Sequence, residues 1–111
     1  MKIGFLLHKS PEHQDANTVK RLADGFADMG HEVSVFLMED GVYNAVVNNS
    51  TGKLSAGFDN LISKGVKIAL CTYTAEIRGL NQPDLFDGVD FHSQYDLSKL
   101  VNECDRFLSF V

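Results

Sequence analysis

Four apolar runs of strand length recur along this chain, and their spacing restricts its fold more than any other feature. They are residues 1–8 (MKIGFLLH), 32–38 (EVSVFLM), 66–71 (VKIALC) and 106–111 (RFLSFV). The first run is almost continuously apolar, which is typical of a strand buried on both faces of a sheet. Segments long enough for helices separate the runs. This alternation predicts a parallel sheet with right-handed crossovers.

The segments between the runs carry helix signals. Ser10 is suited to cap a helix that starts at Pro11 and continues to Met29, and Gly30 is suited to end it. Its apolar positions recur at helical spacing: Ala16, Val19, Leu22, Ala23, Phe26 and Ala27. We also expect a short helical segment at 42–46, a helix at 55–64, a short strand at 89–93 and a helix that Asp96 caps.

Together these elements predict one α/β domain over residues 1–111, a three-layer α/β/α sandwich with a mostly parallel five-stranded sheet. The order of the strands stays open, because the crossover rule sets handedness and not which strand lies at the edge.

Composition excludes several classes of function. A formal net charge of −5, with scattered basic residues, argues against nonspecific nucleic-acid binding. The apolar run at 3–7 is far shorter than the roughly 20 residues that cross a bilayer and lacks a signal-peptide cleavage site. We therefore expect a cytoplasmic protein with no membrane partner. The histidines show no metal-ligand spacing, so neither a metal nor a cofactor is predicted.

Cys71 is the strongest candidate for chemistry. It ends the apolar run at 66–71 and precedes a short segment, 72–78, that reads as the first turns of a helix. Ligands gather at the carboxyl ends of strands in open α/β sheets, and the field of a helix N-terminus favours a thiolate. From these residues alone, a cysteine that merely ends a buried strand and has no function stays an open alternative.

Other residues are candidates for supporting roles. His8 ends the first strand and could reach the same edge of the sheet as an acid or base. Thr72, Thr74 and Arg78 follow the cysteine and could hold an anionic sulfur. Cys104 falls on the apolar stripe of the last helix, so we expect a small core residue there and no disulfide with Cys71.

Several blocks of the chain, in order, resemble the DsrE/DsrF-like family. They are the opening strand, residues 28–33 (DMGHEV), Glu39–Ala45 (EDGVYNA), 65–71 (GVKIALC) with the later Arg78-Gly79 pair, and 104–110 (CDRFLSF). The chain looks most similar to the DsrE and TusD branch. The resemblance covers essentially the whole chain.

The resemblance implies a fold, a function and partners. In the DsrE and TusD branch, a cysteine after the central strand accepts sulfane sulfur as a persulfide and passes it on, and Cys71 matches that cysteine. The family implies homo- or hetero-oligomers, commonly trimers or hexamers, and sulfur donor and acceptor proteins as partners. Tyr43 would lie near subunit contacts, and we expect an exposed apolar face around Val42, Tyr43 and Val46.

The sequence therefore leads to one main hypothesis and one alternative. The main hypothesis is a sulfur-relay protein with Cys71 as the sulfur acceptor, in which the backbone N–H groups of 72–75 stabilise the anion. The alternative is a non-catalytic oligomeric binding module or structural subunit, with a small anionic ligand or a protein partner at the carboxyl edge of the sheet.

Overall fold

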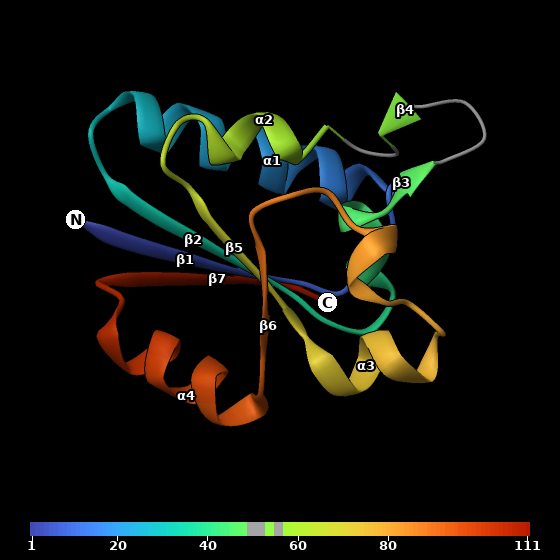
Figure 1. Ribbon diagram of the computed structural model, residues 1–111. Helices are drawn as coiled ribbons and strands as arrows, with labels where there is room; N and C mark the ends of the chain where they lie inside the picture. Colours follow the sequence, from blue (N-terminus) through green and yellow to red (C-terminus); the bar gives the residue numbers. More distant parts are fainter. Residues whose placement is uncertain (49–52, 55–56) are drawn as a thin grey trace.

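The protein folds into a twisted sheet with helices on both faces (Figure 1). The computed structural model describes residues 1–48, 53–54 and 57–111. The strands are β1 (Lys2–Leu7), β2 (Glu32–Leu37), β3 (Val47–Asn48), β4 (Lys53–Leu54), β5 (Lys67–Cys71), β6 (Val89–His92) and β7 (Arg106–Phe110). The helices are α1 (Gln14–Asp28), α2 (Asp59–Ile62), α3 (Thr72–Ile77) and α4 (Gln94–Glu103), with 3-10 helices η1 (Glu39–Ala45) and η2 (Gln82–Asp84).

Five of the strands form one sheet in the order β6-β5-β2-β1-β7, and every neighbouring pair is parallel. The predicted five-stranded α/β fold is confirmed, and the sheet is wholly parallel. Strands β3 and β4 pair with each other as a separate antiparallel ribbon, which the sequence analysis did not predict.

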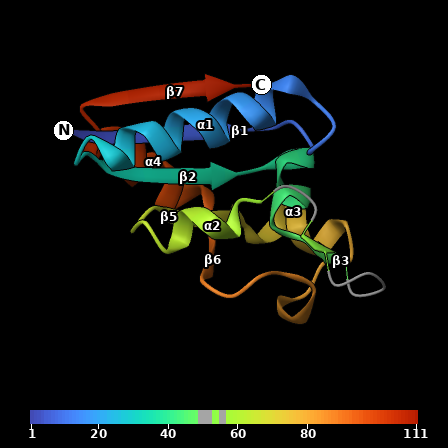
Figure 2. The ribbon, with the colours of Figure 1, turned by 90° about the horizontal axis from the view of Figure 1, so that it is seen from above.

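The strand order explains which helix covers which face. The chain moves in one direction across the sheet from β1 to β2, β5 and β6, and it then returns to the far side of β1 to form β7. A right-handed crossover in the reverse direction places its helix on the opposite face. Accordingly α1 and α2 cover one face and α4 covers the other (Figures 1 and 2).

The two faces bury unequal cores. The face under α1 holds the main core, which includes Phe5, Leu37, Phe58 and Leu70, all at most 1% exposed. The face under α4 holds a small cluster of Phe36, Ala69 and Cys71. Its partly buried neighbours are Leu6, Met38, Leu97 and Leu100. Cys71 therefore belongs to the thinner of the two apolar layers.

The first helix starts later than predicted. Helix α1 begins at Gln14, and its N-cap is His13 and not Ser10. The carbonyl of Ser10 accepts a hydrogen bond from the backbone N–H of His13, and the Ser10 hydroxyl donates to Glu12, so these residues form a turn ahead of the helix. Gly30 follows the helix with φ +87°, as predicted for a terminating glycine.

The other helices also differ from prediction at their ends. Ser93 and not Asp96 is the N-cap of α4, and Asp96 is the third helical residue of a capping box. Cys104 follows α4 as its C-cap and is half-buried, so it is not a core residue of the helix stripe. The predicted helix at 55–64 is the short α2, and residues 55–56 lie outside the described part of the chain.

None of the helices in the described part of the chain is long and apolar enough to span a membrane.

Candidate functional site

Cys71 stands at the carboxyl end of β5, between β2 and β6. It is the last residue of the strand and the N-cap residue of α3, with an extended backbone (φ −73°, ψ 117°). Four of the five residues of β5, Ile68, Ala69, Leu70 and Cys71, are apolar and buried. Such a run suits an inner strand of a parallel sheet, which is covered on both faces. The thiol therefore lies where the sequence analysis placed it along the chain.

The Cys71 side chain is buried among apolar side chains. It is 1% exposed and packs with Phe36 and Ala69 below α4. Met38 and Leu97 are partly buried neighbours of the same cluster. A reagent in solution can reach the sulfur only if part of this layer moves.

The two threonines fasten the turn that follows the cysteine. The Thr72 hydroxyl donates to the carbonyl of His92 at 3.1 Å, which ties the start of α3 to the end of β6. The buried Thr74 hydroxyl donates to the carbonyl of Cys71 at 3.2 Å. Both hydroxyl protons are therefore used by backbone carbonyls.

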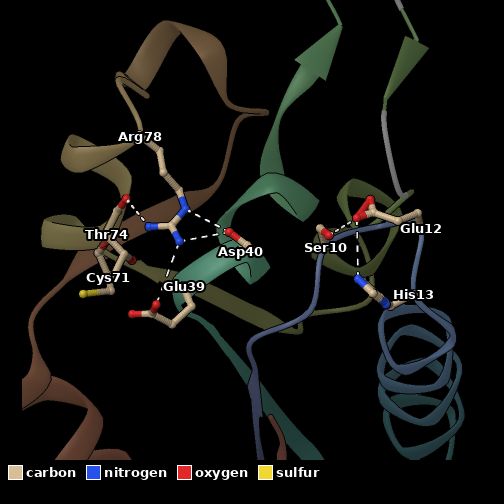
Figure 3. A network of polar contacts seen from close by, with 8 residues as sticks. All are labelled: Ser10, Glu12, His13, Glu39, Asp40, Cys71, Thr74 and Arg78. Atoms are coloured by element: carbon tan, nitrogen blue, oxygen red, sulfur yellow. Dashed lines mark hydrogen bonds and ion pairs between the residues drawn. The ribbon is translucent and has the colours of Figure 1, made fainter.

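Arg78 links α3 to η1. Its Nε and its second terminal nitrogen donate to Asp40 Oδ1 at 3.2 and 2.9 Å, and its other terminal nitrogen donates to the carbonyl of Thr74 at 3.2 Å. Glu39 adds an ion pair at 3.9 Å. Figure 3 shows this network and shows the Cys71 sulfur pointing away from it. The guanidinium thus neutralises carboxylates and does not face the thiol.

His8 lies two strands away from the cysteine. It follows β1, and its backbone N–H donates to the carbonyl of Phe110 on β7 at 2.9 Å. Strand β2 separates β1 from β5, and Met38 at the end of β2 packs against the Cys71 cluster. The strand order thus brings His8 to the predicted edge but leaves one strand between it and the thiol.

The predicted interface residues divide into two kinds. Val42 is fully buried in the main core, so the expectation that it lies on an exposed face is wrong. It is buried because η1 turns it toward the core of its own chain. Tyr43 is 37% exposed and Val46 is half-buried, so these two remain candidates for a subunit contact.

The structure adds one residue that the sequence analysis did not assign to the site. His92 ends β6 and is the Cα partner of Cys71 in the β5–β6 register. The sequence does not show that His92 lies beside Cys71, because this follows from the pairing of β6 with β5, which no local pattern predicts.

His92 also lines a cavity of about 270 Å³ between α4 and the sheet. Buried or apolar side chains such as Phe36 and Ala69 form its floor. Its charged lining residues are Lys2, Lys67, Lys99, Asp90, Asp96 and Glu103. An equal number of lysines and carboxylates suits a small ligand that carries both charges.

The model of the DsrE/DsrF-like family matches residues 1–110. This chain belongs to that family. Two relatives are similar over nearly their whole length. The uncharacterized protein MJ0989 of Methanocaldococcus jannaschii is 31% identical, covering 99% of this chain and 100% of that one. The uncharacterized protein MK0008 of Methanopyrus kandleri is 29% identical, covering 97% and 93%.

Solved structures share the fold of this DsrE/DsrF-like chain. The YchN protein of Escherichia coli superimposes with a TM-score of 0.86 at 22% identity, covering 99% of both chains. A protein of unknown function from Bacteroides thetaiotaomicron, BT1422, gives a TM-score of 0.76 at 17% identity, covering 98% of this chain and 94% of that one. At these identities the likeness concerns the fold alone.

The second cysteine of this DsrE/DsrF-like chain, Cys104, is the C-cap residue of α4. Burial raises the pKa of the Cys104 thiol, so it stays protonated at neutral pH. Among the described residues, no group of three histidine, cysteine or acidic side chains is placed to hold a metal ion. Of the two thiols, Cys71 is the one that the fold places at the carboxyl edge of the sheet.

Proposed function

We propose that this protein accepts sulfane sulfur on Cys71 as a persulfide and passes it to the thiol of a partner protein. The observation that carries the proposal is the place of Cys71: the last residue of an inner strand, at the carboxyl edge of the sheet, in a DsrE/DsrF-like chain. Small ligands and reacting groups gather at this edge in open α/β folds.

The chemistry needs no cofactor. The Cys71 thiolate attacks the outer sulfur of a donor persulfide, R–S–SH. A bond forms between the Cys71 sulfur and the outer sulfur of the donor, while the S–S bond between the donor's inner and outer sulfurs breaks. The donor leaves as R–S⁻ and takes up a proton. The sulfane sulfur atom is transferred whole, so no external oxidant or reductant enters the step. Attack by an acceptor thiolate on the outer sulfur of the Cys71 persulfide repeats the same exchange.

Burial of the thiol sets a condition on this reaction. Cys71 is 1% exposed, so a donor must displace part of the layer over it. Of its partly buried neighbours, Met38 follows the carboxyl end of β2 and Leu97 lies in the first turn of α4, so both are near the edge of the sheet where β5 ends. We infer that the donor opens the layer where β2 ends and α4 begins.

The alternative function is a non-catalytic binding module of the same fold. Two observations favour it: the burial of Cys71 and the mixed-charge cavity under α4. In that case a small ligand occupies the cavity, and replacement of Cys71 leaves binding intact.

Intact-protein mass spectrometry after incubation with a sulfane-sulfur donor tests the two functions. The variants are Cys71→Ser and, as the matched control, Cys104→Ser. The proposal expects a gain of one sulfur atom in the wild type and in Cys104→Ser, and none in Cys71→Ser. The same gain in all three proteins, or in none of them, would overturn it and favour the binding module.

A further inference from the structure

Cys71 and His92 are neighbours across two parallel strands. They are Cα partners in the register of β5 and β6, and adjacent strands lie about 4.8 Å apart. Side chains two positions apart on a strand share a face. Ala69 and Cys71 belong to the cluster below α4, and Asp90 and His92 line the cavity below α4. The thiol and the imidazole therefore lie on the same face of the sheet.

The chain leaves these two strands toward opposite faces of the sheet. The connection after β5 carries Leu85 and Phe86 into the main core on the α1 face. The connection after β6 leads into α4, whose Leu97 and Leu100 pack on the other face. Cys71 and His92 therefore lie between these two connections, at the carboxyl ends of the strands, which is the edge where ligands bind in open α/β sheets.

Access to water differs between the two side chains. The apolar neighbours of Cys71 leave it 1% exposed, so its thiol has little contact with water. His92 is half-buried and lines the open cavity. The imidazole thus lies beside the strand that ends in the thiol and also borders a cavity open to solvent.

The charged groups around His92 balance one another. Lys67 on β5, Asp90 on β6, Lys2 on β1, and Asp96, Lys99 and Glu103 on α4 line the same cavity. Asp96 lies close enough for a protonated His92 to favour its carboxylate form. A Cys71 thiolate and a His92 imidazolium would form one more pair of opposite charges beside these lysines and carboxylates.

We propose that His92 is the acid–base partner of Cys71. The inference rests on the proposed function. A ring nitrogen of His92 takes the thiol proton, the thiolate attacks the donor persulfide, and the imidazolium returns the proton to the departing R–S⁻. One proton moves out and back, one S–S bond forms and one breaks. His8, the candidate acid or base considered from the sequence, follows β1, and β2 lies between β1 and β5, so His8 is too far across the sheet to exchange a proton with the thiol directly.

The test is the alkylation rate of Cys71 against pH, in a Cys104→Ser background that leaves one thiol. We compare His92→Gln with His8→Gln, a matched control because both histidines follow or end a strand at the same edge. The rate in His92→Gln should fall about tenfold or more at pH 7 and converge with the parent at pH 9.5, where hydroxide replaces the imidazole. The rate in His8→Gln should stay within about twofold throughout.

The direction of the change separates this role from a structural one. A loosened layer over Cys71 would raise the alkylation rate at every pH, whereas loss of a proton acceptor lowers it near neutrality only. Profiles of His92→Gln that match those of His8→Gln, or that rise at all pH values, would overturn the proposal. Absence of sulfur uptake by a wild type with the expected profile would refute the sulfur-carrier function and leave the acid–base pair standing.

Discussion

Gly41 lies where η1 crosses the end of β1, and this contact leaves no room for a side chain. A Cβ at this position would overlap the Leu7 carbonyl oxygen and lie 2.8 Å from its carbon. Both groups are backbone, so neither can turn aside. The close approach holds η1 against the carboxyl ends of β1 and β2.

Replacement of Gly41 by alanine should therefore destabilise the fold. We expect Gly41→Ala to lower the free energy of unfolding by about 1–3 kcal/mol, because η1 must shift away from β1. Gly25→Ala is the matched control: Gly25 lies inside α1 with open space around its Cβ position, and alanine there should stabilise by up to about 1 kcal/mol. Urea unfolding of both variants measures the difference. Equal effects would refute the close-approach argument.

At the scale of one element, the start of α4 depends on the ionisation of Asp96. Hydrogen bonds from the backbone N–H and the hydroxyl of Ser93 lower the pKa of this carboxyl. The reciprocal bond from the Asp96 backbone N–H to the Ser93 hydroxyl completes the capping box. Because α4 forms the roof over Cys71 and the cavity, this cap also steadies the site.

The lowered pKa gives the cap a defined pH dependence. A carboxyl whose pKa is lower in the folded state stabilises the fold above its unfolded value, 3.8, and this stabilisation disappears as pH falls through the folded value. Asp96→Asn should therefore lower the thermal midpoint at pH 7 and have little effect at pH 2. Asp87→Asn, in the exposed turn before β6, should change neither midpoint by a comparable amount. A loss for Asp96→Asn that is the same at both pH values would contradict the prediction.

At the scale of the whole molecule, we propose that the protein assembles into a homo-oligomer of three or six chains. Tyr43 on η1 is 37% exposed and Val46 follows it, so this surface is the proposed contact. A large, partly exposed aromatic side chain is a common centre of protein interfaces.

Light scattering after size-exclusion chromatography tests the assembly. The wild type should have a mass of three or six times the 12.3 kDa chain, and Tyr43→Arg should shift it toward the monomer. Tyr95→Arg is the control, because Tyr95 is 72% exposed on α4, and α4 covers the face of the sheet opposite α1. A monomeric wild type would refute the assembly, and dissociation by Tyr95→Arg alone would move the contact to α4.

The sequence by itself determined the five strands of the main sheet, the helices between them and the place of Cys71 along the chain. Apolar runs such as 66–71 indicate strands, because a strand buried on both faces of a parallel sheet needs apolar side chains throughout. Gly30 indicates a helix end, because few other residues adopt a positive φ. These signals are local, so they can be read without the fold.

The tertiary structure alone decided which residues surround the thiol. The pairing of β6 with β5 brings His92 to Cys71, and the position of β2 keeps His8 away. Likewise Arg78 meets Asp40, and Val42 turns into the core, through packing of η1 against α3 and the sheet. Strand order and helix packing arise from contacts between residues far apart in the chain. A local sequence pattern cannot predict those contacts, because the energy of each contact depends on how the distant elements pack together.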